Sequence, residues 1–297
     1  MNWIYFVLIS SGIWSVTSLI DKIVISKGHI KNPIVYMLSN ALMNVLIVFI
    51  LPFAGFGHLK LADFFIALLS GAAFCAAVAI YYKCVEFDEI SKIVILFQLG
   101  PIFVLALSFL FLGEVLTKNH IIGFLFLLGA GAIVSYKKSK KTFRLGKAFY
   151  YMIVSMFLSS VALVTSKHIF NVTGFWSAFL WLRAAEFCAL AVLLAPSIRK
   201  DAINTAKAMK PKIKALVIFK MIIDFSAFMF LGYALLNGPV SLITVLGSSI
   251  LPLFVFLLAS ACSVYFPNIV KEEIGRKALL AKVVAVLFVI IGIFLVS

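Results

Sequence analysis

The sequence predicts an all-α integral membrane protein with ten transmembrane helices, arranged as two inverted five-helix repeats. Three observations support this prediction: an apolar composition, a charge pattern that alternates between apolar segments, and a weak internal repeat. Of the 297 residues, 64% are hydrophobic and only 12% are charged, whereas soluble domains are roughly half apolar and a quarter charged. The mean hydropathy is +1.17. Such a chain is expected in a bilayer rather than in water.

Apolar segments recur from one end of the chain to the other, so no part remains for a soluble domain. A helix needs about 20 residues to cross roughly 30 Å of hydrocarbon. The N-terminal segment lacks a basic leader and a small-residue cleavage site, which is typical of a retained first helix. We predict spans at 3–21, 33–53, 63–82, 93–112, 120–136, 148–170, 174–195, 214–236, 240–266 and 277–296.

The connections between these spans alternate in charge. About twenty Lys and Arg residues lie in the odd-numbered connections, whereas the even-numbered ones contain only Lys60, Lys118 and Lys167. Because Lys and Arg are retained on the cytoplasmic side, this pattern predicts cytoplasmic odd connections and outer termini. The net charge of +15 therefore lies where anionic lipid head groups are the expected partner, and nucleic acid is not expected. The sequence indicates no particular oligomeric state.

The chain matches itself weakly at an offset of about 150 residues, a period that is examined before any local motif. WSVTSLIDK at 14–22 resembles SSVALVTSK at 159–167, and the segment 80–101 resembles the segment 231–252. Two homologous halves with five spans each must insert with opposite orientations, as in many secondary transporters. We therefore expect a first repeat at 1–136, a basic cytoplasmic linker at 137–147 and a second repeat at 148–297.

The first half combines a small-residue first helix with several short motifs. They comprise Trp14, Tyr82, Gln98, Leu99, Gly100, Pro101, Leu112, Gly113, Glu114, Ile122, Gly123, Gly129, Ala130 and Gly131. This combination resembles the drug/metabolite transporter superfamily, specifically its EamA-type ten-helix permeases. The resemblance covers nearly the whole chain, is strongest over 81–135, and favours export; the second half lacks the Gly-Glu turn. Members are usually drawn with cytoplasmic termini, in conflict with the charge count, which we follow.

A tight polar turn separates the fourth and fifth predicted spans. Gly113 is expected to end the fourth helix, since glycine readily adopts the conformation that closes a helix. The carboxylate of Glu114 is expected near the positive N-terminal end of the fifth helix, close to Asn119 and His120. We therefore predict a structural role for Glu114 in the hairpin, ahead of gating or direct substrate contact.

Four charged residues lie inside predicted spans. Arg183 and Glu186 are three residues apart and Lys220 and Asp224 are four apart, so each pair shares one helix face. Charges at this depth cost at least a few kcal/mol and usually face a partner or a cavity. Two interpretations remain open. The pairs either join helices as structural ion pairs, or Arg183 binds a substrate carboxylate or phosphate while Asp224 or Glu186 exchanges a proton.

Glycine and proline occupy matching places in the fourth and ninth predicted spans. Proline removes a backbone donor and disrupts the preceding turn. Matching interruptions indicate a midplane site in repeat transporters. We therefore expect helix breaks at Gly100, Pro101, Gly247 and Pro252. The polar residues expected to turn toward a central cavity are Gln98, Thr244, Ser248 and Ser249, with Trp14 as a further substrate candidate from the first span.

Several chemistries are not supported by any motif. The four Cys and four His residues lack metal-ligand spacing, and no phosphate-binding loop of the ATPase type occurs, so neither a metal nor a cofactor is expected. We predict a secondary transporter of a small organic metabolite, such as an amino acid or related anion, that works by alternating access, with proton coupling as one option. The expected location is a prokaryotic inner membrane. The alternatives are a flippase for lipid or lipid-linked substrates, a membrane-embedded enzyme and a non-transporting scaffold.

Overall fold

The computed structural model describes residues 3–26, 35, 38, 41–87, 96–135, 147–188, 190, 191, 195–265 and 276–297. These residues form helices and contain no strand, so the all-helical class is confirmed. The elements are α1 (Trp3–Ser26), the 3₁₀ helix η1 (Met43–Phe49), α3 (Leu61–Phe87), α5 (Leu99–Leu112), α6 (Lys118–Ser135), α7 (Lys147–Thr173), α8 (Phe175–Phe187), α9 (Pro196–Ala208), α10 (Pro211–Asn237), α11 (Val240–Tyr265) and α12 (Arg276–Val296).

Five of the described helices contain segments long and apolar enough to cross a membrane. Three shorter apolar helices accompany them, in α5, α6 and α12. The five long segments are Trp3–Asp21, Leu61–Tyr81, Phe149–Thr173, Pro211–Asn237 and Val240–Cys262. The chain is therefore built as a multi-pass membrane protein.

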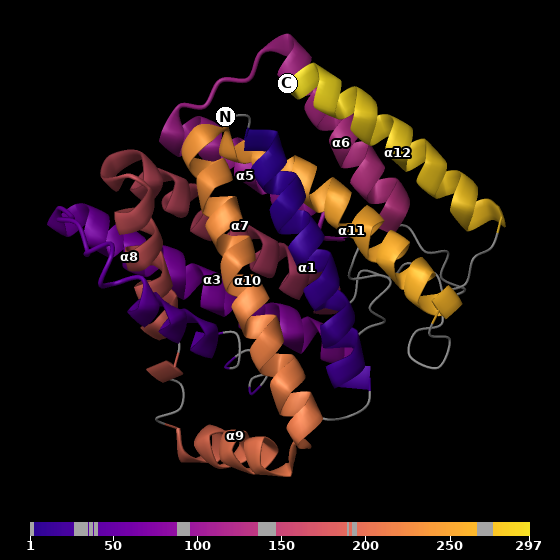
Figure 1. The fold of residues 1–297 in the computed structure, drawn as a ribbon. Coiled ribbons are helices and arrows are strands. Elements are labelled where there is room, and N and C mark those ends of the chain that lie inside the picture. Colours follow the sequence, from indigo (N-terminus) through magenta and orange to yellow (C-terminus); the bar gives the residue numbers. More distant parts are fainter. Residues whose placement is uncertain are drawn as a thin grey trace.

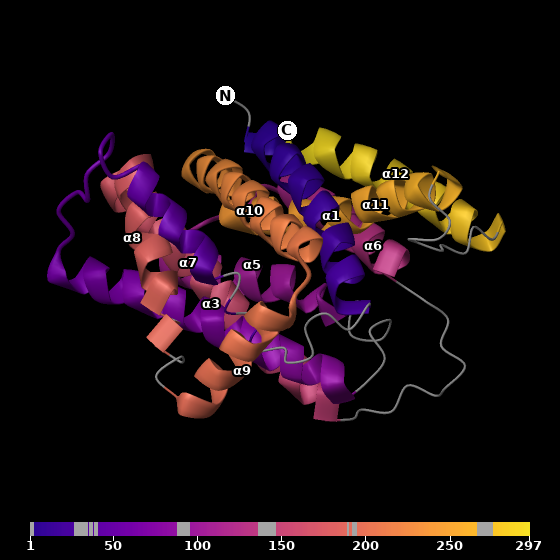
Figure 2. The ribbon, with the colours of Figure 1, turned by 60° about the horizontal axis from the view of Figure 1, so that its bottom comes forward.

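The helices pack in pairs that join the two halves of the chain. Helix α1 lies beside α10 and α11, and α3 lies beside α7 (Figures 1 and 2). Helix α5 contacts both α7 and α11, while α6 and α12 run side by side. Each of these helix pairs therefore combines one helix of the first half with one helix of the second half.

Helices α6 and α12 approach closely because two glycines meet at their contact. A Cβ atom placed on Gly123 would lie 2.6 Å from Val296 Cγ1 and 3.0 Å from the carbonyl oxygen of Gly292. A Cβ atom on Gly292 would lie 2.6 Å from Leu127 Cγ. Small residues of this kind let helix backbones approach in membrane proteins.

Helix α9 is an element that hydropathy did not predict. It lies in the connection between the predicted spans 174–195 and 214–236, where Pro196–Ala208 is a helix. Pro196 occupies its first turn, where proline is well tolerated. Ala202 lies on its half-buried face and packs against a small core cluster that contains Ile20 and Val217. Both chain termini lie at the opposite end of the helical bundle (Figure 1).

Candidate functional site

A cavity of about 230 Å³ lies where α1, η1, α3, α8, α10 and α11 meet. Its lining combines charged groups with aromatic faces. The lining residues are Trp14, Thr17, Ser18, Asp21, Ala41, Met43, Asn44, Phe74, Cys75, Val78, Glu186, Lys220, Asp224, Phe228 and Leu251. The candidates Trp14, Glu186, Lys220 and Asp224 are thus brought to one place, whereas Arg183 is not part of the lining.

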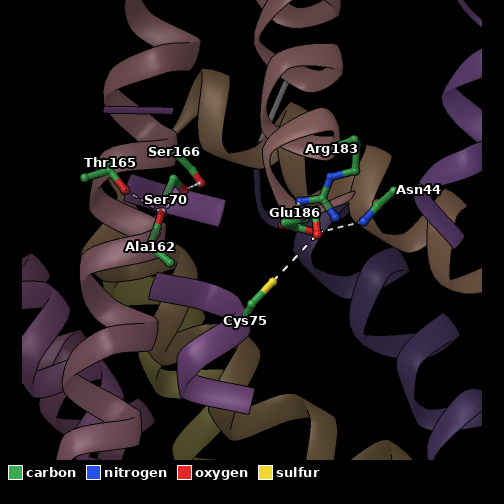
Figure 3. A network of polar contacts seen from close by, with 8 residues as sticks. All are labelled: Asn44, Ser70, Cys75, Ala162, Thr165, Ser166, Arg183 and Glu186. Carbon is green, nitrogen blue, oxygen red and sulfur yellow. Dashed lines mark hydrogen bonds and ion pairs between the residues drawn. The ribbon is translucent and has the colours of Figure 1, made fainter. Parts of the chain in front are cut away.

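The first ion pair lies within α8 and is buried. Arg183 Nη2 donates to Glu186 Oε1 at 2.5 Å, and the guanidinium lies 4.3 Å from the ring centre of Phe228. Glu186 Oε2 accepts a hydrogen bond of 3.5 Å from Asn44 Nδ2, and its backbone carbonyl accepts one from the thiol of Cys75. Figure 3 shows Glu186 between these three side chains. Glu186 therefore connects α8 with η1 and α3.

The second charged group joins the two halves of the chain. Lys220 Nζ lies 2.8 Å from Asp224 Oδ2 on its own helix and 3.4 Å from Asp21 Oδ1 on α1. Lys220 is only 3% exposed. One buried ammonium is therefore shared by two carboxylates, one from each half, and all three side chains line the cavity.

Sequence reasoning missed Asp21 and Asn44. A periodic signal for Asp21 was present, since Trp14, Thr17, Ser18 and Asp21 are spaced i, i+3, i+4 and i+7 and share one helix face. All four line the cavity. Asn44 gave a weaker signal, as an amide within an apolar segment.

The predicted helix break at Gly100 and Pro101 lies at the start of α5, and residues 93–95 of the predicted fourth span lie outside the described residues. Helix α5 begins at Leu99, so Pro101 lies in its first turn, directly after Gln98. Gln98 Nε2 donates to the carbonyl of Ser248 at 3.3 Å, and Ser248 Oγ donates to Gln98 Oε1 at 3.4 Å. A Cβ atom on Gly131 would lie 2.5 Å from Gln98 Oε1. The Gln98 side-chain amide therefore connects the start of α5 with α11 and packs against Gly131 of α6, rather than facing the cavity.

The predicted interruption in the ninth span is wrong, because α11 continues from Val240 to Tyr265 through Gly247 and Pro252. Its hydroxyl groups donate hydrogen bonds to nearby backbone carbonyls instead of facing the cavity. Thr244 Oγ1 donates to Val240 O at 2.7 Å. Ser249 Oγ donates to Leu127 O on α6 at 2.5 Å. A proline inside an apolar segment thus did not require a break, and these hydroxyls satisfy buried carbonyls.

Glu114 binds a different helix from the one we expected. Gly113 ends α5 as predicted, with φ +65°. The carboxylate of Glu114 then accepts hydrogen bonds from Val240 N–H at 2.8 Å and from Ser241 Oγ at 3.1 Å, and a longer one from Ser241 N–H. It therefore caps the N-terminus of α11, not that of α6. The amide groups in the first turn of a helix lack internal acceptors, and a carboxylate satisfies them.

Comparison with known proteins agrees with this architecture. Residues 1–136 match the EamA-like transporter family. Among solved structures, one crystal structure with 15% sequence identity aligns with a TM-score of 0.68 over 99% of this chain and 97% of its own chain, which establishes a shared fold. No curated protein matches the sequence. The resemblance inferred from the sequence is thus confirmed over residues 1–136, which match the EamA-like transporter family.

Proposed function

We propose that the chain is a secondary transporter that moves a small organic metabolite across a prokaryotic inner membrane by alternating access, in the direction of export. The cavity is the observation that carries this proposal. It is lined by α1, η1 and α3 from the first half and by α8, α10 and α11 from the second. Charged residues inside a membrane protein usually mark a substrate or ion pathway. The volume of about 230 Å³ lies below the range of roughly 300–1,000 Å³ of drug-sized sites, which favours a small metabolite.

The helix pairings support two five-helix repeats. Suppose that α1, α3, α5 and α6 of the first repeat correspond to α7, α10, α11 and α12 of the second. The pair α1 and α10 then corresponds to the pair α7 and α3, and the pair α1 and α11 corresponds to the pair α7 and α5. The pairs α5 with α11 and α6 with α12 each correspond to themselves. Contacts occur in all of these pairs. Since each repeat carries an odd number of spans, we propose that the repeats are inverted about an axis through this packing.

An amino acid fits the lining better than a simple anion does. Our expectation of an anion rested on Arg183, which is paired with Glu186 and is not part of the lining. Among the described residues, three carboxylates and one ammonium line the cavity, so their field opposes a substrate of purely negative charge. We propose a substrate that carries an amino group, with Asp224 or Glu186 as the proton-exchanging group.

Flux measurements test this proposal. Purified protein in liposomes is expected to accumulate a labelled amino acid when a proton gradient is imposed, and to exchange it without a gradient. Liposomes without protein, and liposomes in which the gradient is collapsed by a protonophore, are the controls. Lipid movement between leaflets without solute flux, for every amino acid and amine tested, would favour a flippase and contradict the proposal.

A further inference from the structure

We infer that the cavity contains a subsite for a protonated primary ammonium group, with Asn44 Oδ1 and Asp224 Oδ1 as its acceptors. The identification of this ligand as a transported substrate rests on the proposed function. The subsite itself is inferred from the cavity lining.

Two buried acceptor atoms of the lining have no hydrogen-bond partner among the described residues: Asn44 Oδ1 and Asp224 Oδ1. Asn44 is 1% exposed and Asp224 is 7% exposed. The other polar atom of each side chain is engaged, since Asn44 Nδ2 donates to Glu186 and Asp224 Oδ2 pairs with Lys220. The contact with Glu186 orients the Asn44 amide so that its oxygen, not its nitrogen, is left over. A ligand that satisfies both atoms must be a hydrogen-bond donor.

The charge of the lining specifies a cation. Among the described residues of the lining, the carboxylates are Asp21, Glu186 and Asp224 and the cation is Lys220. If Arg183 is counted with its partner Glu186, the carboxylates of these described residues still outnumber the cations by one. A bound ammonium would neutralise this excess, and it also provides three N–H donors.

The aromatic walls favour the same ligand. The Trp14 and Phe228 rings lie 5.3 Å apart in an edge-to-face arrangement, and Phe74 lies 6.1 Å from Phe228. Aromatic faces attract cations and accommodate an apolar body beside the charge. The two acceptors come from different elements, η1 and α10, so at least two N–H groups are needed. A quaternary ammonium has none and is expected to bind poorly.

Calorimetry on the purified full chain tests the subsite with four probes that share a phenyl ring. Phenethylammonium is expected to bind, whereas its trimethylated derivative, 3-phenylpropanoate and 2-phenylethanol are not. Asn44→Leu and Asp224→Asn are each expected to weaken phenethylammonium binding about tenfold or more, the usual effect of losing a hydrogen bond to a charged group. Ser226→Ala is the matched control, because Ser226 lies on α10 and its hydroxyl bonds only within its own helix.

A second measurement leaves the acceptor residues Asn44 and Asp224 unsubstituted. Cys75 lines the cavity, so in a chain whose other three cysteines are replaced by Ala, phenethylammonium is expected to slow alkylation of Cys75. Equal protection by the propanoate or by the trimethylated derivative would overturn the inference. So would sodium ions that protect equally well, or unchanged binding in both acceptor variants.

These outcomes are separable from those of the flux experiment. If phenethylammonium protects Cys75 but no solute crosses the liposome membrane, the transport proposal fails and the subsite stands. If carboxylates without an amino group are transported and phenethylammonium neither binds nor protects, the subsite fails and the transport proposal stands.

Discussion

At the scale of single residues, two carboxylates share the ammonium group of Lys220, and they lie at different distances from it. Asp224 is its closer partner, at 2.8 Å, and lies on the same helix, whereas Asp21 lies at 3.4 Å on α1. A proton-coupled carrier needs a carboxylate whose ionisation changes between its two states. We propose Asp224 for this role, because it is the closer partner of Lys220 and the more buried carboxylate, with a side-chain exposure of 10% against 32% for Asp21.

Asp224→Asn is therefore expected to abolish the dependence of flux on a pH gradient while leaving substrate exchange at equilibrium partly intact. Asp21→Asn is the matched control, since it removes the other partner of Lys220 and is expected to retain gradient-driven flux. Labelled-substrate uptake into liposomes, with and without an imposed gradient, measures both. A stable Asp224→Asn protein that still concentrates substrate when driven by protons would return Asp224 to a structural role.

The pair Arg183 and Glu186 is expected to act on stability instead. Both side chains are about nine-tenths buried, and removing one partner of a buried pair leaves an uncompensated charge. Arg183→Met is therefore expected to lower the free energy of unfolding by about 3–5 kcal/mol. Adding Glu186→Leu should recover much of this loss. Thermal unfolding in detergent compares the three chains, and a double variant no more stable than the single one would contradict the argument.

The charged residues that sequence reasoning found share one property: the spacing within a single helix reveals them. Arg183 with Glu186, and Lys220 with Asp224, are adjacent on one helix face whatever the tertiary packing. Asp21 shares one face of α1 with Trp14 and could have been found from its spacing, whereas Asn44 becomes a site residue only because η1, α8 and α10 meet. Which helices meet depends on tertiary packing, which local spacing does not encode.

At the scale of elements, Glu114 shows how a short turn of one half stabilises a helix of the other. Its carboxylate caps α11 across the boundary between the halves. Glu114→Ala is expected to cost about 0.5–2 kcal/mol, the usual range for a lost helix cap. Glu114→Gln should cost less, because one amide oxygen remains as an acceptor. Chemical unfolding of the three chains checks this order, and equal stability of all three would contradict the capping role.

The contact between α6 and α12 allows a comparison within one helix. A Cβ atom on Gly123 would clash with α12, whereas one on Gly129 would lie 3.4 Å from the Phe288 ring, which is ordinary contact. Gly123→Ala is therefore expected to lose about 1–3 kcal/mol of stability through overpacking. Gly129→Ala is expected to be neutral or slightly stabilising, because alanine favours the helix. If both variants melt at the same temperature, the helices are not held together at Gly123.

Element boundaries show where hydropathy succeeds and where it fails. The long apolar helices were predicted because each has enough apolar residues to cross hydrocarbon. Helix α9 was not, because its apolar face is narrow and its charges dominate a hydropathy average. Six positions of the predicted span 33–53 lie outside the described residues, namely 33, 34, 36, 37, 39 and 40.

At the scale of the whole molecule, the charge pattern predicts the orientation in the membrane. Helix α9 and the termini lie at opposite ends of the bundle (Figure 1), as the alternating charges require. We expect α9 on the cytoplasmic side and the termini outside. In a chain without native cysteines, a cysteine at Asn171 should react with an impermeant thiol reagent added from outside, and one at Ser197 should not. The reverse pattern would overturn this orientation.

If the protein works by alternating access, as we propose, its halves must separate at the end of the bundle that carries the termini. Polar contacts join them there: Asp63 pairs with His168 at 2.8 Å, and Ser70 Oγ lies 2.9 Å from Ser166 Oγ (Figure 3). The cavity lies toward the other end, since Asp21 is near the last turns of α1. Under the proposed mechanism, this structure would be a state closed at the termini, and opening it would break the contacts between α3 and α7.

Hydroxyl groups this close on two short side chains place Ser70 and Ser166 within reach of a disulfide. In a chain without native cysteines, Ser70→Cys with Ser166→Cys is expected to lose flux on oxidation and to regain it on reduction. Phenethylammonium binding should persist throughout, because the cavity lies on the other side of this contact. Each single cysteine variant controls for the substitution itself. A fully cross-linked protein that transports at an unchanged rate would show that α3 and α7 stay together during the cycle, and would place the moving boundary elsewhere in the bundle.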